Sequence, residues 1–117
     1  MMSPPVKQLQ RLGDHQLELT IAIEPEQPCF AGHFDGWPVL AGVVQVDWVM
    51  QLARQHLGCE QRFLGLQSVK FQQLVRPPLL LSLSLEYMPQ RGLIRFSYRH
   101  GERLLSTGAI KVDEAST

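Results

Sequence analysis

The sequence has few cysteines, no surplus of charge and no long apolar run, and each shortage excludes a class of protein. Cys29 and Cys59 are its two cysteines; they lack metal-ligand spacing and form no disulfide framework, which favours a reducing compartment and a cytoplasmic location. Eleven basic residues balance eleven acidic ones, whereas nucleic-acid-binding proteins usually carry a basic excess. No stretch of about 18 apolar residues is present, so we expect no membrane insertion.

The length and the apolar content fit one globular domain. The chain has 117 residues, of which 44% are apolar, and a chain of this size can bury one hydrophobic core. We therefore predict a single domain over residues 1–117, with residues 1–5 frayed and without an apolar secretion signal.

Alternating apolar and polar residues predict strands on both sides of a long loop and a helix. Residues 16–24, QLELTIAIE, have an apolar residue at every second position, which is typical of a half-buried strand. Residues 25–38 contain three prolines and two glycines and are predicted to form a loop. Further strands are expected after Gly58, in segments 62–75, 79–88, 93–100 and 103–112.

Residues 42–58, GVVQVDWVMQLARQHLG, are typical of a buried helix. Gly42 opens this segment and Gly58 suits its carboxyl end. Its apolar residues cover most of the circumference, and a helix that is apolar nearly all round is buried. One hydrophobic helix wrapped by a curved antiparallel sheet is the simplest packing of these elements, so the expected fold class is α+β.

Asp47 is an acid inside this apolar helix, and polar residues are placed around it in a pattern that suits proton transfer. Gln51 is four residues further on and shares its helix face. His33 precedes Asp47 by fourteen residues in the glycine-flanked loop. A neutral imidazole can remove a proton, an enclosed carboxylic acid can donate one, and N–H groups at a helix start such as Gly42 can stabilise a developing enolate. Together these groups could dehydrate a substrate beside a carbonyl group.

The segment GHFDGWPVLAGVVQVDWVMQ resembles the motif of the hotdog-fold 3-hydroxyacyl-acyl-carrier-protein dehydratases. The VVQVDW register is also similar to the short dehydratases of aryl-polyene clusters. The residues that match the motif are Gly32, His33, Phe34, Pro38, Val39, Leu40, Gly42, Asp47 and Gln51. The sequence departs from the motif at Ala41, where the family usually has proline, and at Asp35, where proline is common.

The resemblance implies a fold, a reaction and a set of partners. The fold would be a hotdog, with a curved antiparallel sheet around one central helix, and the working unit would be a homodimer or a dimer-based oligomer. The substrate would be an acyl chain on the phosphopantetheine arm of an acyl carrier protein, and no metal or other cofactor is implied. His33 of one subunit would take the C2 proton, and Asp47 of the other would protonate the leaving C3 hydroxyl.

Four further residues have implied roles in binding the substrate. The Gly42 N–H would hold the thioester carbonyl oxygen, and Gln51 would position Asp47. Phe34 and Trp37 of the loop would contact the substrate.

Simpler interpretations of the same residues stay open. His33 could be a structural loop residue, and Asp47 could form an ion pair with Arg54 on the same helix face. Cys29 is expected to be a small buried residue rather than a nucleophile. The chain could also be a hotdog thioesterase or a non-catalytic acyl-binding subunit. A group of arginines in one predicted hairpin is either a solvated face or a docking surface for an acidic carrier protein: Arg91, Arg95, Arg99 and Arg103.

Overall fold

The computed structural model describes residues 2–30 and 38–115. Within these ranges the chain forms one α-helix, six strands and two short 3-10 turns. In chain order they are β1 (Val6–Gly13), β2 (Gln16–Ile23), η1 (Pro28–Phe30), α1 (Gly42–His56), β3 (Phe63–Phe71), β4 (Leu79–Met88), η2 (Pro89–Arg91), β5 (Leu93–His100) and β6 (Arg103–Val112).

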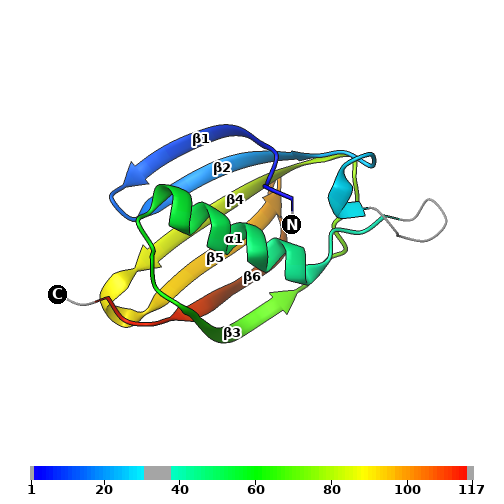
Figure 1. The fold of residues 1–117 in the computed structure, drawn as a ribbon. Helices are drawn as coiled ribbons and strands as arrows, with labels where there is room; N and C mark the ends of the chain where they lie inside the picture. Colours follow the sequence, from blue (N-terminus) through cyan, green and yellow to red (C-terminus); the bar gives the residue numbers. More distant parts are fainter. Residues whose placement is uncertain (1, 31–37, 116–117) are drawn as a thin grey trace.

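The six strands form one antiparallel sheet in the order β1-β2-β4-β5-β6-β3. The sheet curves around α1, which lies along its concave side (Figure 1). The expected α+β class and the hotdog arrangement of one helix wrapped by a sheet are thereby confirmed. Strands β1 and β3 are the two edges of this sheet.

The alternating residues of the central strands build the core beneath the helix. Leu19 on β2 lies opposite Leu83 on β4, which lies opposite Tyr98 on β5. All three side chains are buried, because residues at every second position point to the same face of a sheet. Trp48 of α1 is completely buried in the same core, so the helix and the sheet are held together mainly by apolar contact.

The helix starts at Gly42 as predicted, but it is not buried all round. Its last helical residue is His56, and Gly58 follows with a positive φ of 68°, a conformation that suits glycine at a helix end. Val43 is 69% exposed, so the expected fully buried helix is wrong on the face that carries Val43. Within the described ranges, no helix is long and apolar enough to cross a membrane.

The expectation that residues 1–5 are frayed is wrong for the described residues 2–5. The Met2 carbonyl accepts hydrogen bonds from Trp48 Nε1 and Gln51 Nε2 at 3.1 and 3.3 Å. The Pro5 carbonyl accepts one from the Ala22 N–H at 3.1 Å. This segment then continues into β1, a strand that the sequence pattern did not predict.

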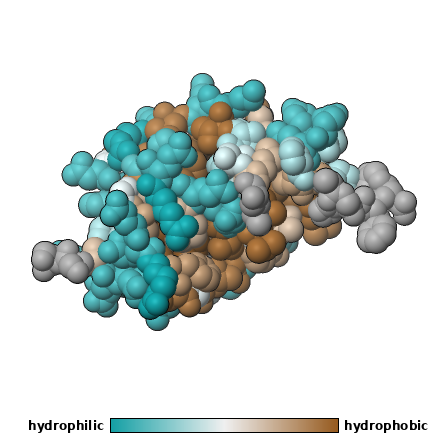
Figure 2. Space-filling model, viewed as in Figure 1, coloured by the Kyte–Doolittle hydropathy of each residue, from teal (hydrophilic) through white to brown (hydrophobic). Residues whose placement is uncertain are grey.

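Strand β3 is an apolar edge that its own chain leaves uncovered. Seven of its nine residues are exposed, and Phe63, Leu64 and Leu66 are 43%, 50% and 50% exposed. Figure 2 shows apolar surface gathered over β3 and the adjoining side of α1, in the lower part of the view. An edge strand presents unpaired backbone N–H and C=O groups, so an apolar one is a template for another chain.

Candidate active site

The Asp47 carboxylate and the Gln51 amide meet on one face of α1, as their spacing predicts. Gln51 Nε2 donates a hydrogen bond of 2.6 Å to Asp47 Oδ2. The same nitrogen also contacts the Met2 carbonyl at 3.3 Å. Both side chains are half-buried, so the carboxylate has a fixed orientation and stays accessible to a small molecule.

The first turn of α1 offers backbone donors that no described residue uses. Among the described residues, the N–H groups of Gly42 and Val43 have no hydrogen-bond partner, whereas those of Val44 and Gln45 bond the Ala41 carbonyl. No side chain caps this end, and no acid lies in the first turn. The positive end of the helix dipole is therefore free to interact with a carbonyl oxygen or an anion.

Gly42 leaves room for an aromatic ring at this helix start. A Cβ atom on Gly42 would lie 2.7 Å from the nearest Phe71 ring atom, which is too close for any other residue unless the ring moves. Phe71 is 49% exposed. Because Gly42 has no side chain, the Phe71 ring of β3 can lie against the helix start, near its free N–H donors.

Ala41 has the backbone conformation that proline would impose. Its φ is −61°, and proline fixes φ near −65°. Its N–H makes no hydrogen bond within the described residues. We expect Ala41→Pro to raise the free energy of unfolding by about 0.4–1 kcal/mol, because the unfolded chain loses conformational freedom.

Thermal and urea unfolding measure this change. The matched control is Ala53→Pro in the helix interior, where the same substitution should cost about 3 kcal/mol. A lower unfolding midpoint for Ala41→Pro would mean that the turn into α1 is not held in this conformation.

A buried polar cluster under the first turn of α1 was missed by the sequence analysis. Gln45 is only 3% exposed. Its Nε2 donates to the Leu40 carbonyl at 3.0 Å, and its Oε1 accepts from Ser106 Oγ at 2.7 Å. Its backbone carbonyl accepts from Tyr98 Oη at 2.6 Å. The sequence could have indicated this cluster, because Gln45 precedes Trp48 by three residues and Val49 by four. It therefore shares the helix face that packs against the sheet.

Tyr98 links this cluster electrostatically to Asp47. Burial, and then the negative charge of Asp47, raise the pKa of the Tyr98 hydroxyl well above its usual value. The hydroxyl therefore remains a donor to Gln45 throughout the neutral range, and it lies close enough to Asp47 to respond to its charge.

Several predicted site residues cannot be placed. His33, Phe34 and Trp37 lie outside the described residues, as do Gly32 and Asp35. Their roles stay predictions.

Two of the simpler interpretations concern residues that the structure does place. The Asp47–Arg54 ion pair is not found; the one ion pair in the described part of the chain joins Arg62 and Asp113 at 3.4 Å. Cys29 packs against the core but is half-buried rather than fully buried as expected, and burial raises the pKa of its thiol, which disfavours the thiolate that a nucleophile needs.

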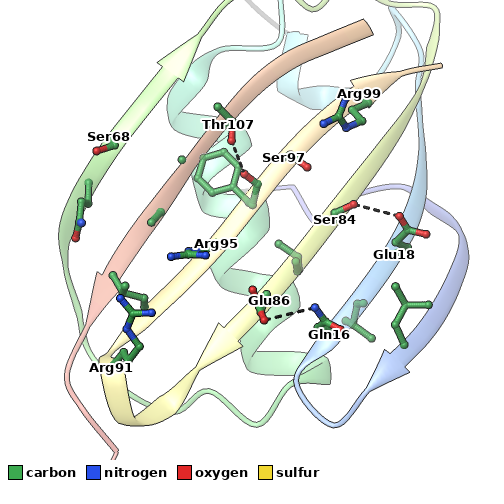
Figure 3. Close-up of a pocket in the computed structure, with 18 residues that line it drawn as sticks. Gln16, Glu18, Ser68, Ser84, Glu86, Arg91, Arg95, Ser97, Arg99 and Thr107 are labelled. Atoms are coloured by element: carbon green, nitrogen blue, oxygen red, sulfur yellow. Dashed lines mark hydrogen bonds between the residues drawn. The ribbon is translucent and has the colours of Figure 1, made fainter. Parts of the chain in front are cut away.

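A groove in the described structure lies on the other face of the sheet. It measures about 690 Å³ and opens on the outer face, with α1 behind the strands (Figure 3). Arg91, Arg95 and Arg99 line it and form no ion pair with any described residue. The sheet separates this groove from Asp47, so it is not the acyl site, and its use as a docking surface stays a prediction.

Comparison with known proteins identifies the family. A family model described as ApeI-like, ApeI dehydratase, matches residues 9–109. The chain belongs to the ApeI-like dehydratase family. The matched range of this ApeI-like chain includes α1 with Gly42, Asp47 and Gln51, as well as His33.

The ApeI-like chain is similar to named dehydratases in sequence and in structure. The 3-hydroxyacyl-[acyl-carrier-protein] dehydratase FabZ of Chlamydia trachomatis is 37% identical over 70 residues, which are 52% of this chain and 46% of that protein. FabZ of Syntrophobacter fumaroxidans is 32% identical over 96 residues, or 69% of this chain and 65% of that protein. The ApeI-like chain spans about half the length of most of the curated relatives it matches, among them that of Chlamydia trachomatis.

A solved structure also matches closely. A chain of the dehydratase heterocomplex ApeI:P from Xenorhabdus doucetiae superposes with a TM-score of 0.89 and is 31% identical; the match covers 95% of this chain and 98% of that chain. The hotdog fold of the ApeI-like chain and its kinship with dehydratases therefore rest on sequence and structure together.

Proposed function

We propose that the protein dehydrates a 3-hydroxyacyl thioester, carried on an acyl carrier protein, to the trans-2-enoyl thioester. The observation that carries this proposal is the Asp47 carboxyl group, held by Gln51 on the same helix whose first turn leaves the Gly42 N–H free among the described residues. Such an arrangement provides an acid and a carbonyl-binding group on one helix, as a dehydration next to a thioester requires. Membership of the ApeI-like family supports this choice of reaction. We place the reaction in fatty-acid or polyene-type synthesis, in the cytoplasm.

The proposed mechanism moves two protons and releases one water molecule. The His33 imidazole takes the C2 proton, and the electron pair moves onto the thioester carbonyl oxygen, which the Gly42 N–H stabilises. The enolate then collapses to form the C2–C3 double bond, while Asp47 protonates the C3 hydroxyl, directly or through a held water. His33 and Asp47 return to their starting states by exchanging the proton with solvent.

Gln51, Phe34 and Trp37 have supporting roles in this proposal. Gln51 orients the Asp47 carboxyl group through the hydrogen bond of 2.6 Å. Phe34 and Trp37 contact the acyl chain near the entrance of its tunnel.

The proposed working unit is a homodimer that forms through β3. The exposed apolar residues of this edge, Phe63, Leu64 and Leu66, gain a covered environment when a second copy adds its own β3. Phe71 of β3 lies against Gly42, so a second chain on this edge stands beside the helix start. His33 of that chain could then approach Asp47.

Charged residues on β3 should prevent this association. We expect Leu64→Lys/Leu66→Lys to convert the dimer into a monomer and to abolish dehydration, because desolvated lysines oppose pairing at the edge. Light scattering after size-exclusion chromatography measures the change. Leu9→Lys/Leu12→Lys is the matched control, since these leucines are 40% and 51% exposed on the opposite edge, β1.

The outcome also separates a homodimer from a mixed assembly. A wild-type chain that is monomeric at all concentrations would contradict the homodimer. The ApeI:P heterocomplex makes a related dehydratase chain the next partner to test in that case.

Mass spectrometry of the carrier-bound acyl group tests the reaction. After incubation with a 3-hydroxyacyl carrier protein, we expect the loss of one water from the acyl chain with the thioester intact. Release of a free thiol and a 3-hydroxy acid would instead identify a thioesterase. Binding without any change in mass would identify a non-catalytic acyl-binding subunit.

A further inference from the structure

Gln45 is a polar residue in a buried position. It is one of two buried polar or charged side chains among the hydrophobic core of the described residues, the other being its partner Ser106. A buried amide costs free energy unless each of its polar groups finds a partner. An apolar side chain of similar size could fill the same volume without this requirement, so the hydrogen bonds of Gln45 call for an explanation beyond packing.

The bonds of Gln45 join three separate parts of the chain at one helix turn. Nε2 holds the carbonyl of Leu40 in the segment that enters the helix, and the Leu40 N–H is itself bonded to the Val75 carbonyl at 2.7 Å. Oε1 is held by Ser106 of β6, and the Gln45 carbonyl by Tyr98 of β5. The entering segment and the helix turn are thus both fixed against the sheet.

Among the described residues, no other hydrogen bond attaches the start of this turn to the sheet. No side chain caps the helix, and the neighbouring contacts with the sheet are apolar. Apolar contact has little directionality, so it allows a helix to shift or rotate slightly, whereas hydrogen bonds define distance and angle. The turn fixed in this way is the one that connects Gly42 to Asp47.

We propose that Gln45 is a positioning residue, which sets the Gly42 N–H and the Asp47 carboxyl group relative to the substrate by tying the first turn of α1 to β5, β6 and Leu40. This inference rests on the proposed dehydration. A displacement of catalytic groups by about 1 Å can lower a rate by about 100-fold. Loss of these ties should therefore lower kcat more than it changes KM.

A double variant separates positioning from stability. Gln45→Leu alone leaves the Ser106 hydroxyl and the Leu40 carbonyl unpaired, so it should be destabilised. Gln45→Leu/Ser106→Ala also removes the hydroxyl and should regain much of that stability, because removing both partners of a buried hydrogen bond costs less than removing one. We expect kcat of the double variant to stay about 10- to 100-fold below wild type, with KM changed little. A kcat that recovers together with the melting temperature would overturn the proposal.

A milder pair of variants keeps the test valid if Gln45 variants fail to fold. Tyr98→Phe removes only the hydroxyl that bonds the Gln45 carbonyl. Tyr87→Phe is its matched control, because its hydroxyl bonds Gln61 Oε1 at 3.4 Å, beyond the other end of α1. We expect Tyr98→Phe to lower kcat several-fold and Tyr87→Phe to leave it unchanged. Equal kcat values for both variants would contradict the positioning role.

Hydrogen exchange supplies a measurement that does not depend on activity. We expect faster exchange at the amides of residues 45–47 in Tyr98→Phe and in the double variant, and unchanged exchange there in Tyr87→Phe. Unchanged exchange in all three variants would overturn the inference. If the wild-type protein removes no water from any 3-hydroxyacyl carrier protein, the proposed function fails, and the exchange rates alone decide whether Gln45 fixes the turn.

Discussion

We expect the replacement of Asp47 by asparagine to lower the rate of the proposed dehydration by about 10²- to 10⁴-fold and to leave the fold intact. The amide has nearly the same shape as the carboxyl group and can still accept the hydrogen bond from Gln51 Nε2, which spans 2.6 Å. It cannot, however, give up a proton as an acid. Because the interaction lost is one with the departing hydroxyl, kcat should fall while KM stays close to the wild-type value.

Single-turnover mass spectrometry with a 3-hydroxyacyl carrier protein measures this rate, and circular dichroism during heating checks the fold. Asp113→Asn is the matched control. Asp113 is a partly exposed acid whose ion pair with Arg62 spans 3.4 Å, and loss of such a pair should change stability by less than about 1 kcal/mol. Wild-type turnover by the Asp47→Asn protein would remove Asp47 from the mechanism.

Two inactive variants should restore activity to each other when they share a dimer. In the proposed assembly, each site takes His33 from one chain and Asp47 from the other. A dimer of one His33→Ala chain and one Asp47→Asn chain therefore has one site with both native groups and one site with neither. Isolated through two different affinity tags, this mixed dimer should have about half of the wild-type activity, since one of its two symmetric sites is intact.

The result of this mixing experiment distinguishes two geometries. If His33 and Asp47 acted within one chain, each site of the mixed dimer would lack one group, and the dimer would be as inactive as its parents. A mixed dimer of two differently tagged wild-type chains controls for any effect of the tags. An inactive mixed dimer alongside an active tagged control would contradict a site shared between subunits.

The central part of the fold could be predicted because its residues alternate on a sheet with one buried face. In β2 and β4, Leu19 and Leu83 point into the core while Glu18 and Ser82 are exposed to solvent. Strand β1 has no such contrast, since all but the first of its residues are exposed, and its apolar residues Val6, Leu9 and Leu12 do not alternate. The strand β1 forms because it pairs with β2, and the local sequence of β1 does not show which strand it pairs with.

In the candidate site too, contacts between residues close in sequence could be predicted, whereas contacts between distant residues could not. The meeting of Asp47 and Gln51 follows from helical spacing and could be predicted. The bonds of Gln45 to Tyr98 and Ser106 cross 53 and 61 residues of sequence, so they depend on the register between the helix and two strands. The exposure of Val43 was also unpredictable, because hydrophobicity alone does not say which face of a helix its own sheet leaves bare.

The unequal edges of the sheet bear on whether this protein would form fibres. The β3 edge carries the exposed residues Phe63, Leu64 and Leu66, whereas β1 at the far side mixes the exposed Leu9 and Leu12 with polar and charged residues such as Lys7 and Gln10. Two copies that join through β3 use the same surface twice and leave only β1 edges outward. Such a two-fold contact is closed and does not propagate. The same β3 pairing that forms the dimer therefore leaves no β3 edge on which a fibre could grow.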